Sequence, residues 1–524
     1  MTTISEIKME VENLDIKKAG AFSNISARHI KQVEDVIVEP LMHIWNRQII
    51  DNENFPFKLK QADITPIFKK LDCILKENYR PVSILPVVSK IFERLMDKQI
   101  KSYIEKYLSP FLCGYRKGYN SQYALLAMIE KWKEQLDKTA GITGGVMMDL
   151  SKAFDTLNHE LLIAKLEAYG FDNGALTILL SYSSDRWQRT KINTSFSTWS
   201  EILGGVPQGS ILGPLLFNIY INDLFYQFLN THACNFADDT TLSALSTSLE
   251  DLLYNLEHDL LSATLWFDNN YMKLNHNKCH FLTSGNAYEH LWIKVGDELI
   301  WESSEEKLLG VTIDKNLKFN SHLTELCKKV GHKVTALARI AKLLPFHKRR
   351  ILLKTFIESQ FSYCPLVWMF CSRKLNNKIN HIHERALRMV YLDYTSSFDE
   401  LLRNDKSTSI HHRKIHHVAI EMYKVINNLS PPFIREIFNY QGYGRVTRMG
   451  EKFTKPKINN VYKGESSLRH FGPVVWNTMI PNKLKTCSSL AEFKNNIKSW
   501  IPSNCPCRLC KLYVKGVGFV KAIE

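Results

Sequence analysis

Two adjacent aspartates near the middle of the chain constrain the fold more than any other feature. The run from His232 to Phe236 leans apolar, Asp238 and Asp239 follow it, and Thr240 opens a Thr-Thr-Leu run. This pattern predicts a β-hairpin that carries two carboxylates at its tip. Like charges at this spacing repel each other, so the pair invites a divalent cation. A lone Asp-Asp pair is commonly a solvated turn, and its meaning here depends on its neighbours.

The composition describes a large, folded and basic chain. Its 524 residues suit three or four domains, and a hydrophobic content of 45% argues against global disorder. Lys and Arg number 68 against 53 acidic residues, so the net charge of +15 indicates a polyanionic partner, although a merely soluble basic protein would look the same. The eleven cysteines are scattered, which argues against a disulfide framework. Cys505, Cys507 and Cys510 alone cluster, and they predict a zinc site only if a fourth ligand joins them.

A second aspartate stands at the end of a predicted strand. Residues 145–150 read as a buried strand that closes on Asp149, where a charge is costly unless it is paired or bound to a metal. Capping the next helix is the ordinary alternative. Further along, residues 202–222 carry no charge and have the length of a membrane span. Their glycines and prolines, together with Gln208, instead predict a loop that allows close backbone approach, followed by a buried helix.

Three cations and a series of helices complete the pattern. Lys69, Lys70 and Arg80 lie in short extended runs, and they suit a triphosphate because arginine offers a planar fork and lysine a point charge. Solvated loop cations are the alternative. Periodicity predicts helices at 88–106, 122–136 and 249–269, a further strand at 307–314, and amphipathic helices with a basic bias from residue 321.

The order of these features is more informative than any one of them. A strand-end aspartate, a Gly/Pro/Gln loop and an aspartate hairpin follow one another along the chain. Two separated acidic sites can share a pair of Mg²⁺ ions roughly 4 Å apart, which activate a 3′-hydroxyl and stabilise a leaving pyrophosphate. Mg²⁺ needs only a few carboxylates besides substrate phosphates, so a full protein cage is not required.

In this order the motifs are specific, and the chain resembles the reverse transcriptases of non-LTR (LINE-type) retrotransposons, in particular the Jockey-like and related clades. The matching segments are Phe-Lys-Lys at 68–70, Asn-Tyr-Arg-Pro at 78–81, Gly-Tyr-Arg-Lys-Gly at 114–118, Asp-Leu-Ser-Lys-Ala-Phe-Asp at 149–155, Gly-Val-Pro-Gln-Gly-Ser at 205–210, Phe-Ala-Asp-Asp at 236–239, Asn-His-Asn-Lys-Cys at 275–279 and Leu-Leu-Gly-Val at 308–311. The resemblance covers nearly the whole chain, because residues 320–500 also resemble the thumb and C-terminal region of such elements.

The resemblance implies an α+β fold of the right-hand polymerase type with a mostly helical C-terminal region. A reverse transcriptase domain is expected over about 50–315. The expected parts are an N-terminal helical extension at 1–50, fingers at 50–140, a palm with an antiparallel sheet at 141–315, a helical thumb or connection at 316–430, and a basic C-terminal region with the Cys cluster at 431–524.

The resemblance also assigns catalytic roles. It makes Asp149, Asp238 and Asp239 the catalytic triad that binds Mg²⁺. The carbonyl of Leu150 is expected to assist one metal ion. Lys278 is expected near the leaving pyrophosphate, where it would act as a general acid.

Further residues are expected to touch the nucleotide or the template. Phe154 stands where the family keeps the bulky group that rejects a ribose 2′-hydroxyl. Phe236 replaces the tyrosine that is commonest across reverse transcriptases. Gln208 and Gly209 are expected to touch the template and the incoming nucleotide, and the three cations named above would hold the triphosphate.

The implied reaction is extension of a DNA 3′-end on an RNA template, with dNTP substrates and two Mg²⁺ ions for which Mn²⁺ can substitute. The expected partners are template RNA and primer or target DNA, in an intracellular (nuclear or cytoplasmic) ribonucleoprotein away from membranes. Such elements usually carry an endonuclease ahead of the polymerase; none is recognised here, so the expectation is a fragment, a truncated copy or an endonuclease supplied elsewhere. The alternatives are an RNA-dependent RNA polymerase, a group II intron or telomerase-type enzyme, and a domesticated or decayed copy that binds nucleic acid without polymerising.

Overall fold

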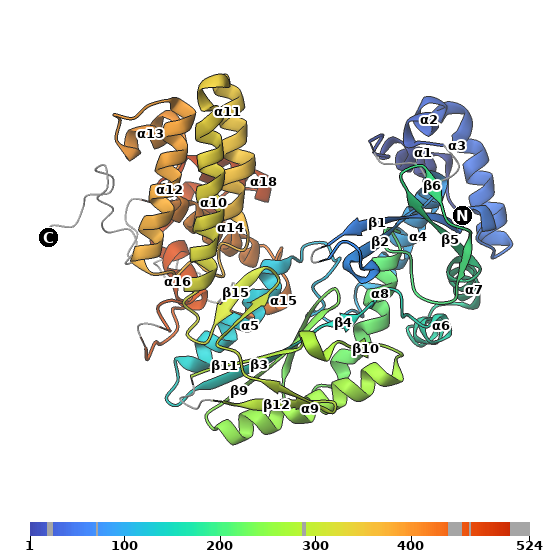
Figure 1. The fold of residues 1–524 in the computed structure, drawn as a ribbon, viewed down its shortest axis with the longest axis horizontal. Helices are drawn as coiled ribbons and strands as arrows, with labels where there is room; N and C mark the ends of the chain where they lie inside the picture. The colour runs from blue at the N-terminus through green and yellow to red at the C-terminus, as the bar shows by residue number, and fades with distance from the viewer. Residues whose placement is uncertain (18–24, 70–71, 286–289, 439–452, 461–462, 503–524) are drawn as a thin grey trace.

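The computed structural model describes residues 1–17, 25–69, 72–285, 290–438, 453–460 and 463–502. Helices and sheets are mixed along the chain, which confirms the predicted α+β class. An N-terminal part, a central sheet and a helical C-terminal part lie in turn from right to left in Figure 1. Within these ranges, no helix combines the length and the apolar character that crossing a membrane requires.

The N-terminal part packs helices against a small mixed sheet. The strand order is β2-β1-β5-β6, and β7 also pairs with β5. Because β1 runs antiparallel to β2 but parallel to β5, this sheet joins two segments that are far apart in the sequence. Its strands are β1 (Gln61–Phe68), β2 (Tyr79–Ile84), β5 (Arg186–Ile192), β6 (Ser195–Phe196) and β7 (Ser200–Ile202). The helices on this side of the molecule are α1 (Ile4–Glu12), α2 (Ala27–Gln32), α3 (Glu34–His43), α4 (Val87–Ile104), α6 (His159–Ala168) and α7 (Asn173–Ser183).

The central sheet is antiparallel throughout, in the order β11-β3-β9-β8. Alternate residues of a strand face opposite sides of a sheet. Accordingly, Val146 and Met148 pack into the core beneath the sheet, whereas Met147 packs into the core shared with the C-terminal helices. The elements are β3 (Ile142–Met148), β8 (His232–Phe236), β9 (Asp239–Ser246) and β11 (His280–Ser284), with α9 (Leu249–Asn269) against one face and α5 (Ser121–Leu136) against the other.

Shorter elements surround this sheet. The uncharged run at 202–222 forms a loop followed by the buried helix α8 (Gly213–Ile221), as predicted. The single strand predicted at 307–314 is wrong, because positive φ values at Leu309 and Gly310 turn the chain and make a hairpin. The strand pairs are β4 (Leu150–Ser151) with β10 (Lys273–Leu274), β12 (Trp292–Val295) with β13 (Glu298–Trp301), and β14 (Glu305–Leu308) with β15 (Val311–Asp314).

The C-terminal part is a group of amphipathic helices. The predicted apolar stripe of its first helix is buried, and that helix packs against α12. The helices are α10 (Asn320–Ile340), α11 (Phe346–Leu352), α12 (Arg373–Tyr391), α13 (Phe398–Asn404), α14 (Ile410–Ile426), α15 (Pro432–Glu436), α16 (Leu468–Val474), α17 (Asn482–Lys485) and α18 (Leu490–Asn496).

Helix α5 connects the central sheet to the C-terminal helices. The Tyr123 hydroxyl donates to the buried carboxylate of Glu421 on α14, at 2.8 Å. At the other end of α5, Arg469 pairs with Asp137 at 2.8 Å. One helix therefore holds the sheet on one side and the helical part on the other.

Two glycines should respond oppositely to the same substitution. A Cβ at Gly145 in β3 would lie 2.8 Å from the ring of Trp132, which is fully buried and cannot move aside. We expect Gly145→Ala to destabilise the fold by about 1–3 kcal/mol through overpacking. A Cβ at Gly331, inside α10, meets no atom within 4 Å, so Gly331→Ala should stabilise by about 0.5–1 kcal/mol through helix propensity. Thermal unfolding followed by circular dichroism measures both; shifts of the same sign would contradict the packing described here.

Candidate active site

The β8–β9 hairpin places two carboxylates side by side at its tip. Ala237 turns the chain with φ +60, an uncommon conformation for a residue with a side chain. The buried side chain of Asn235 stabilises this turn by donating to the Ala237 carbonyl and to the Thr240 hydroxyl, at 2.8 and 2.9 Å. Asp238 and Asp239 follow directly, both half-buried, as the sequence predicts for a hairpin.

The register of the central sheet brings Asp149 to the same place. Met148, the last residue of β3, pairs with Thr240 of β9, so the strand ends beside the hairpin tip. The carbonyl of Asp149 accepts from the Asn275 amide at 2.9 Å, and its carboxylate lies 2.7 Å from the ammonium of Lys278. Four side chains that the sequence assigns to catalysis are thus brought into one neighbourhood.

Burial and mutual repulsion shape the charges of this cluster. Burial raises the pKa of Asp239 to about 6, and the charges of Asp238 and Asp149 act in the same direction, whereas Lys278 opposes them. Burial also raises the pKa of the Tyr115 hydroxyl, with a further contribution from Asp238. The cluster therefore carries more negative than positive charge, and a cation bound there would lower the repulsion between its carboxylates.

The carboxylates have the chemistry of a Mg²⁺ site but are not gathered around one point. In the part of the chain that the structure describes, no three His, Cys, Asp or Glu side chains lie close enough together to hold a metal ion. The carboxylate of Asp149 instead forms an ion pair with the ammonium group of Lys278. Leu150, the expected carbonyl ligand, lies in β4 directly after Asp149. Carboxylate and carbonyl oxygens are the ligands that Mg²⁺ prefers, so the donor set fits.

An aromatic wall lies beside the carboxylates. The ring of Phe154 stacks on Phe217 at 4.7 Å between centroids, and Tyr115 meets its edge at 5.9 Å. Tyr115 follows Gly114, whose Cα lies so close to the hairpin that an added Cβ would fall 2.4 Å from the Ala237 nitrogen. Reasoning from sequence placed Phe154 here and missed Tyr115, although the Gly-Tyr pair in the 114–118 motif was a usable signal.

The Pro-Gln-Gly loop (residues 205–212) is held on both sides. The Gln208 side chain donates to Asp155 at 2.9 Å, and its carbonyl accepts from the Ser83 amide of β2 at 2.7 Å. Gly209 has φ +129 and lies against the Ser83 carbonyl, where a Cβ would come within 2.6 Å. The loop therefore bridges the segment after Asp149 and the strand that carries Arg80.

The remaining predicted residues are placed less closely. Lys69 and Arg80 are both exposed, at the paired ends of β1 and β2. Arg80 opposes the rise that burial causes in the pKa of Tyr115, which puts it within electrostatic reach of that hydroxyl. Lys70 lies outside the described residues, as do Cys505, Cys507 and Cys510 of the predicted zinc site. Arg116, in the 114–118 motif, binds Glu105 and stacks on Tyr119, so its guanidinium is engaged within the protein.

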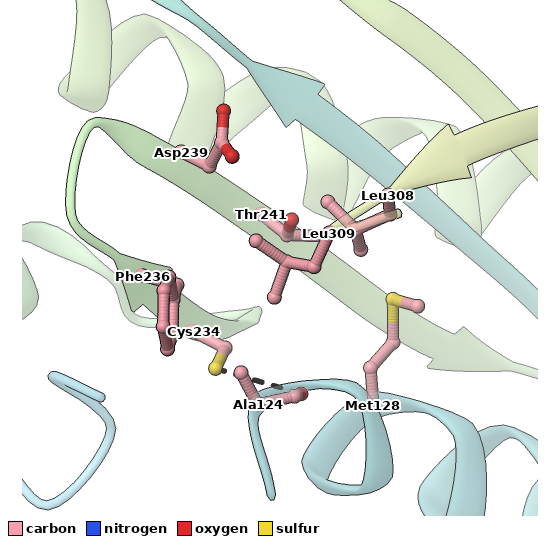
Figure 2. Close-up of a pocket in the computed structure, with 8 residues that line it drawn as sticks. All are labelled: Ala124, Met128, Cys234, Phe236, Asp239, Thr241, Leu308 and Leu309. Atoms are coloured by element: carbon pink, nitrogen blue, oxygen red, sulfur yellow. Dashed lines mark hydrogen bonds between the residues drawn. The ribbon is translucent and has the colours of Figure 1, made fainter. Parts of the chain in front are cut away.

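A small, mainly apolar pocket adjoins the hairpin (Figure 2). Phe236 lies on its wall with Asp239 at the rim. The lining residues are Ala124, Met128, Cys234, Phe236, Asp239, Thr241, Leu308 and Leu309. The turn of the β14–β15 hairpin thus packs beside the strand that carries Asp239.

Comparisons with known proteins find a family model that matches part of the sequence. Residues 67–313 match the family model described as reverse transcriptase (RNA-dependent DNA polymerase). The RNA-directed DNA polymerase from mobile element jockey of Drosophila melanogaster is 25% identical over 74% of this chain and 44% of its own length. The jockey polymerase of Drosophila funebris is 27% identical, and the probable RNA-directed DNA polymerase from transposon BS of Drosophila melanogaster is 25% identical, with the same coverage. The chain thus spans less than half the length of these relatives.

The match to solved structures is looser. Apo telomerase from Candida tropicalis has a TM-score of 0.35 and 11% identity, over 56% of this chain and 61% of that one. Telomerase from Candida albicans in complex with an RNA fragment has a TM-score of 0.37 and 13% identity, over 73% of this chain and 68% of that one.

Replacing Asp239 by Asn should stabilise the protein above pH 6. The folded-state pKa of about 6 exceeds the ordinary value of 3.8, so the folded protein holds the proton more tightly than the unfolded chain, and stability falls as the pH rises from about 4 to about 6. A shift of this size corresponds to about 3 kcal/mol, which partial exposure to solvent reduces to about 1–2 kcal/mol. We expect Asp239→Asn to exceed the wild type by that amount at pH 7.5 and not at pH 4.

Urea unfolding without divalent cations measures this difference. Asp268→Asn, on the exposed face of α9, is the control and should change the unfolding free energy by less than about 0.5 kcal/mol. Equal stabilities of Asp239→Asn and wild type at pH 7.5 would show that repulsion within the cluster is not a cost to the fold.

Proposed function

Because residues 67–313 belong to the reverse transcriptase family, we propose that this chain is the polymerase part of a non-LTR retrotransposon protein, extending a DNA 3′-end on an RNA template. The observation that carries the proposal is the register of the central sheet, which ends β3 beside the tip of the β8–β9 hairpin and so brings Asp149 within electrostatic reach of Asp239 and its neighbour Asp238. Lys278 completes the group at 2.7 Å from Asp149. Such carboxylates on adjacent strand ends suit nucleotidyl transfer, in which positioning and charge supply most of the catalysis.

The three spatial parts fit the divisions of a right-hand polymerase. In this proposal the central sheet is the palm, the helices from α10 onward are the thumb and its connection, and the sheet around β1 and β2 forms the fingers. The fingers would take β5–β7 from the middle of the sequence, since β5 pairs with β1. Residues 1–50 would be a helical extension to the fingers.

Each part of the site has a proposed task. Two Mg²⁺ ions, when bound to the three carboxylates, would lower the pKa of the primer 3′-hydroxyl and neutralise the leaving pyrophosphate. Arg80 and Lys69 would bind the triphosphate, because exposed cations at the paired ends of β1 and β2 match its charge. Lys278 would leave its ion pair with Asp149 and bind the pyrophosphate, beside which its ammonium group would hold a proton. Phe154 would lie against the sugar and exclude a 2′-hydroxyl.

Primer extension on an RNA template with dNTPs and Mg²⁺ tests the activity. We expect extension by wild type and a loss of at least about 1,000-fold in Asp238→Asn, because several kcal/mol of transition-state stabilisation depend on the metal site. Asp268→Asn on α9 is the matched control and should retain wild-type rates. RNA binding by the wild type without extension would instead favour a chain that binds nucleic acid and does not polymerise.

Sugar selection gives a second test. We expect Phe154→Ala to increase the efficiency of ribonucleotide incorporation relative to deoxynucleotides by about 10–100-fold, as removing a steric contact of this size allows. Phe196→Ala, on exposed β6, removes an aromatic ring away from the carboxylates and should leave the ratio unchanged. If Phe154→Ala leaves the ratio of ribonucleotide to deoxynucleotide incorporation unchanged, Phe154 does not contact the sugar and does not select against the 2′-hydroxyl.

A further inference from the structure

A fully buried carboxyl group on α4 contacts the end of the Pro-Gln-Gly loop. Oε2 of Glu93 accepts from the Ile211 amide at 2.6 Å and from the Leu212 amide at 3.4 Å. Its Oε1 accepts from the Ser89 hydroxyl at 3.1 Å. Glu93 has no exposed surface, so its position in the core is set by these partners and by packing.

These contacts lie at the two residues that immediately precede helix α8. Helix α8 begins at Gly213, and Leu212 at its N-cap position provides no side-chain hydrogen bond to the free amides. Amides at a helix N-terminus need an acceptor, and a carboxylate there also interacts favourably with the helix dipole. The Ser210 hydroxyl accepts from the Gly213 amide at 3.0 Å, and Glu93 accepts from the two amides before it, so the loop end is tied to α4.

The surroundings of Glu93 tie it to the rest of the N-terminal part. The buried guanidinium of Arg186, at the start of β5, is the charged group that faces it, and Arg186 donates to the Tyr182 carbonyl at 2.8 Å. Burial raises the pKa of Glu93, and the two amides and Arg186 act in the opposite direction. The carboxyl group therefore stands between α4, the loop and the start of β5, and its hydrogen-bond donors come from α4 and the loop.

The other end of the loop leads to the candidate active site. His159 binds the Gly205 carbonyl at 2.7 Å, and the Val206 amide donates to the Phe154 carbonyl at 2.8 Å. Gln208 lies between these contacts and Glu93. A shift of the loop at Ile211 therefore moves Gln208 relative to Phe154.

We propose that Glu93 is a positioning residue for nucleotide binding: its buried carboxyl group fixes the 205–212 loop so that Gln208 and Gly209 face the incoming nucleotide. The inference rests on the proposed polymerase function. Glu93 touches neither substrate nor metal, and it acts through the loop. Its loss should raise the KM for dNTP more than it lowers kcat.

The chain contains a matched control for this role. Glu130 on α5 is also buried, and its Oε2 accepts from the amides of Leu468 and Arg469 at 2.8 and 3.2 Å, at the start of α16. As at Glu93, a buried carboxyl group accepts from two successive backbone amides, but Glu130 also pairs with Lys133 at 3.4 Å and its helix end lies in the C-terminal part. A general loss of stability should therefore affect Glu93→Gln and Glu130→Gln alike, whereas a loss of loop position should affect only the first.

Steady-state primer extension distinguishes the two cases. We expect Glu93→Gln to raise the KM for dNTP about tenfold with kcat within about threefold of wild type, the size of one lost hydrogen bond to a charged group. Glu130→Gln should leave KM unchanged at a similar loss of Tm. If Glu93 acts through Gln208, the KM of Glu93→Gln/Gln208→Ala should equal that of Gln208→Ala alone. An unchanged KM in Glu93→Gln, equal shifts in both glutamate variants, or additive effects in the double variant would overturn the proposal.

Hydrogen exchange tests the loop without relying on polymerase activity. Amides of residues 208–212 should exchange faster in Glu93→Gln than in wild type, and those at 468–469 faster in Glu130→Gln. Unchanged exchange at 208–212 would overturn the proposal whether or not the protein polymerises. Absence of extension by wild type, with faster exchange in Glu93→Gln, would overturn the polymerase function and the nucleotide role while leaving the loop contact. If Glu93→Gln does not fold, Glu93→Asp, which withdraws the carboxyl group by one methylene, is judged by the same criteria.

Discussion

The pairing of β3 with β9 is the constraint on which the rest of the structure depends. Met148 opposite Thr240 sets the register, and a slip of one residue would turn every side chain of β3 to the wrong face. The two faces of this strand bury different residues, Val146 on one side and Met147 on the other, in two separate cores. Hydrophobic burial on both faces therefore fixes where Asp149 emerges beside Asp238 and Asp239.

That fixed geometry holds charges together that repel each other. Burial is the main cause of the raised pKa of Asp239, the charges of Asp238 and Asp149 add to it, and Lys278 opposes them. A sheet covered on one face alone would relax by moving its strand ends apart. Here α9 and α5 cover opposite faces of the central sheet. The packing of both helices therefore offsets the free-energy cost of holding the carboxylates together. A cluster of carboxylates held together in this way is suited to binding cations.

Local sequence signals account for the elements and for the aspartates. The hairpin at Asp238 and the strand end at Asp149 were predictable because alternating burial and turn residues are encoded within a few positions. The hairpin at 307–314 was not, because the turn at Leu309 and Gly310 lies in an apolar run that reads as one strand. Contacts such as that of Gln208 with Asp155 join residues that are far apart in the sequence, so the hydrophobic periodicity of the sequence does not predict them.

Three buried glutamates make tertiary contacts that residue spacing in the sequence does not reveal. Glu93, Glu130 and Glu421 occupy helix positions that look like ordinary polar sites, yet each accepts hydrogen bonds from a distant segment. Removing one partner of such a contact leaves a buried polar group unsatisfied, which costs more than the contact itself contributes. Two of these contacts join α5 to the C-terminal helices, so a substitution at Glu130 or Glu421 would leave a buried donor across this junction without its acceptor. The junction along α5 is therefore held more firmly than the exposed ends of β1 and β2, where Lys69 and Arg80 remain free to adapt to a ligand.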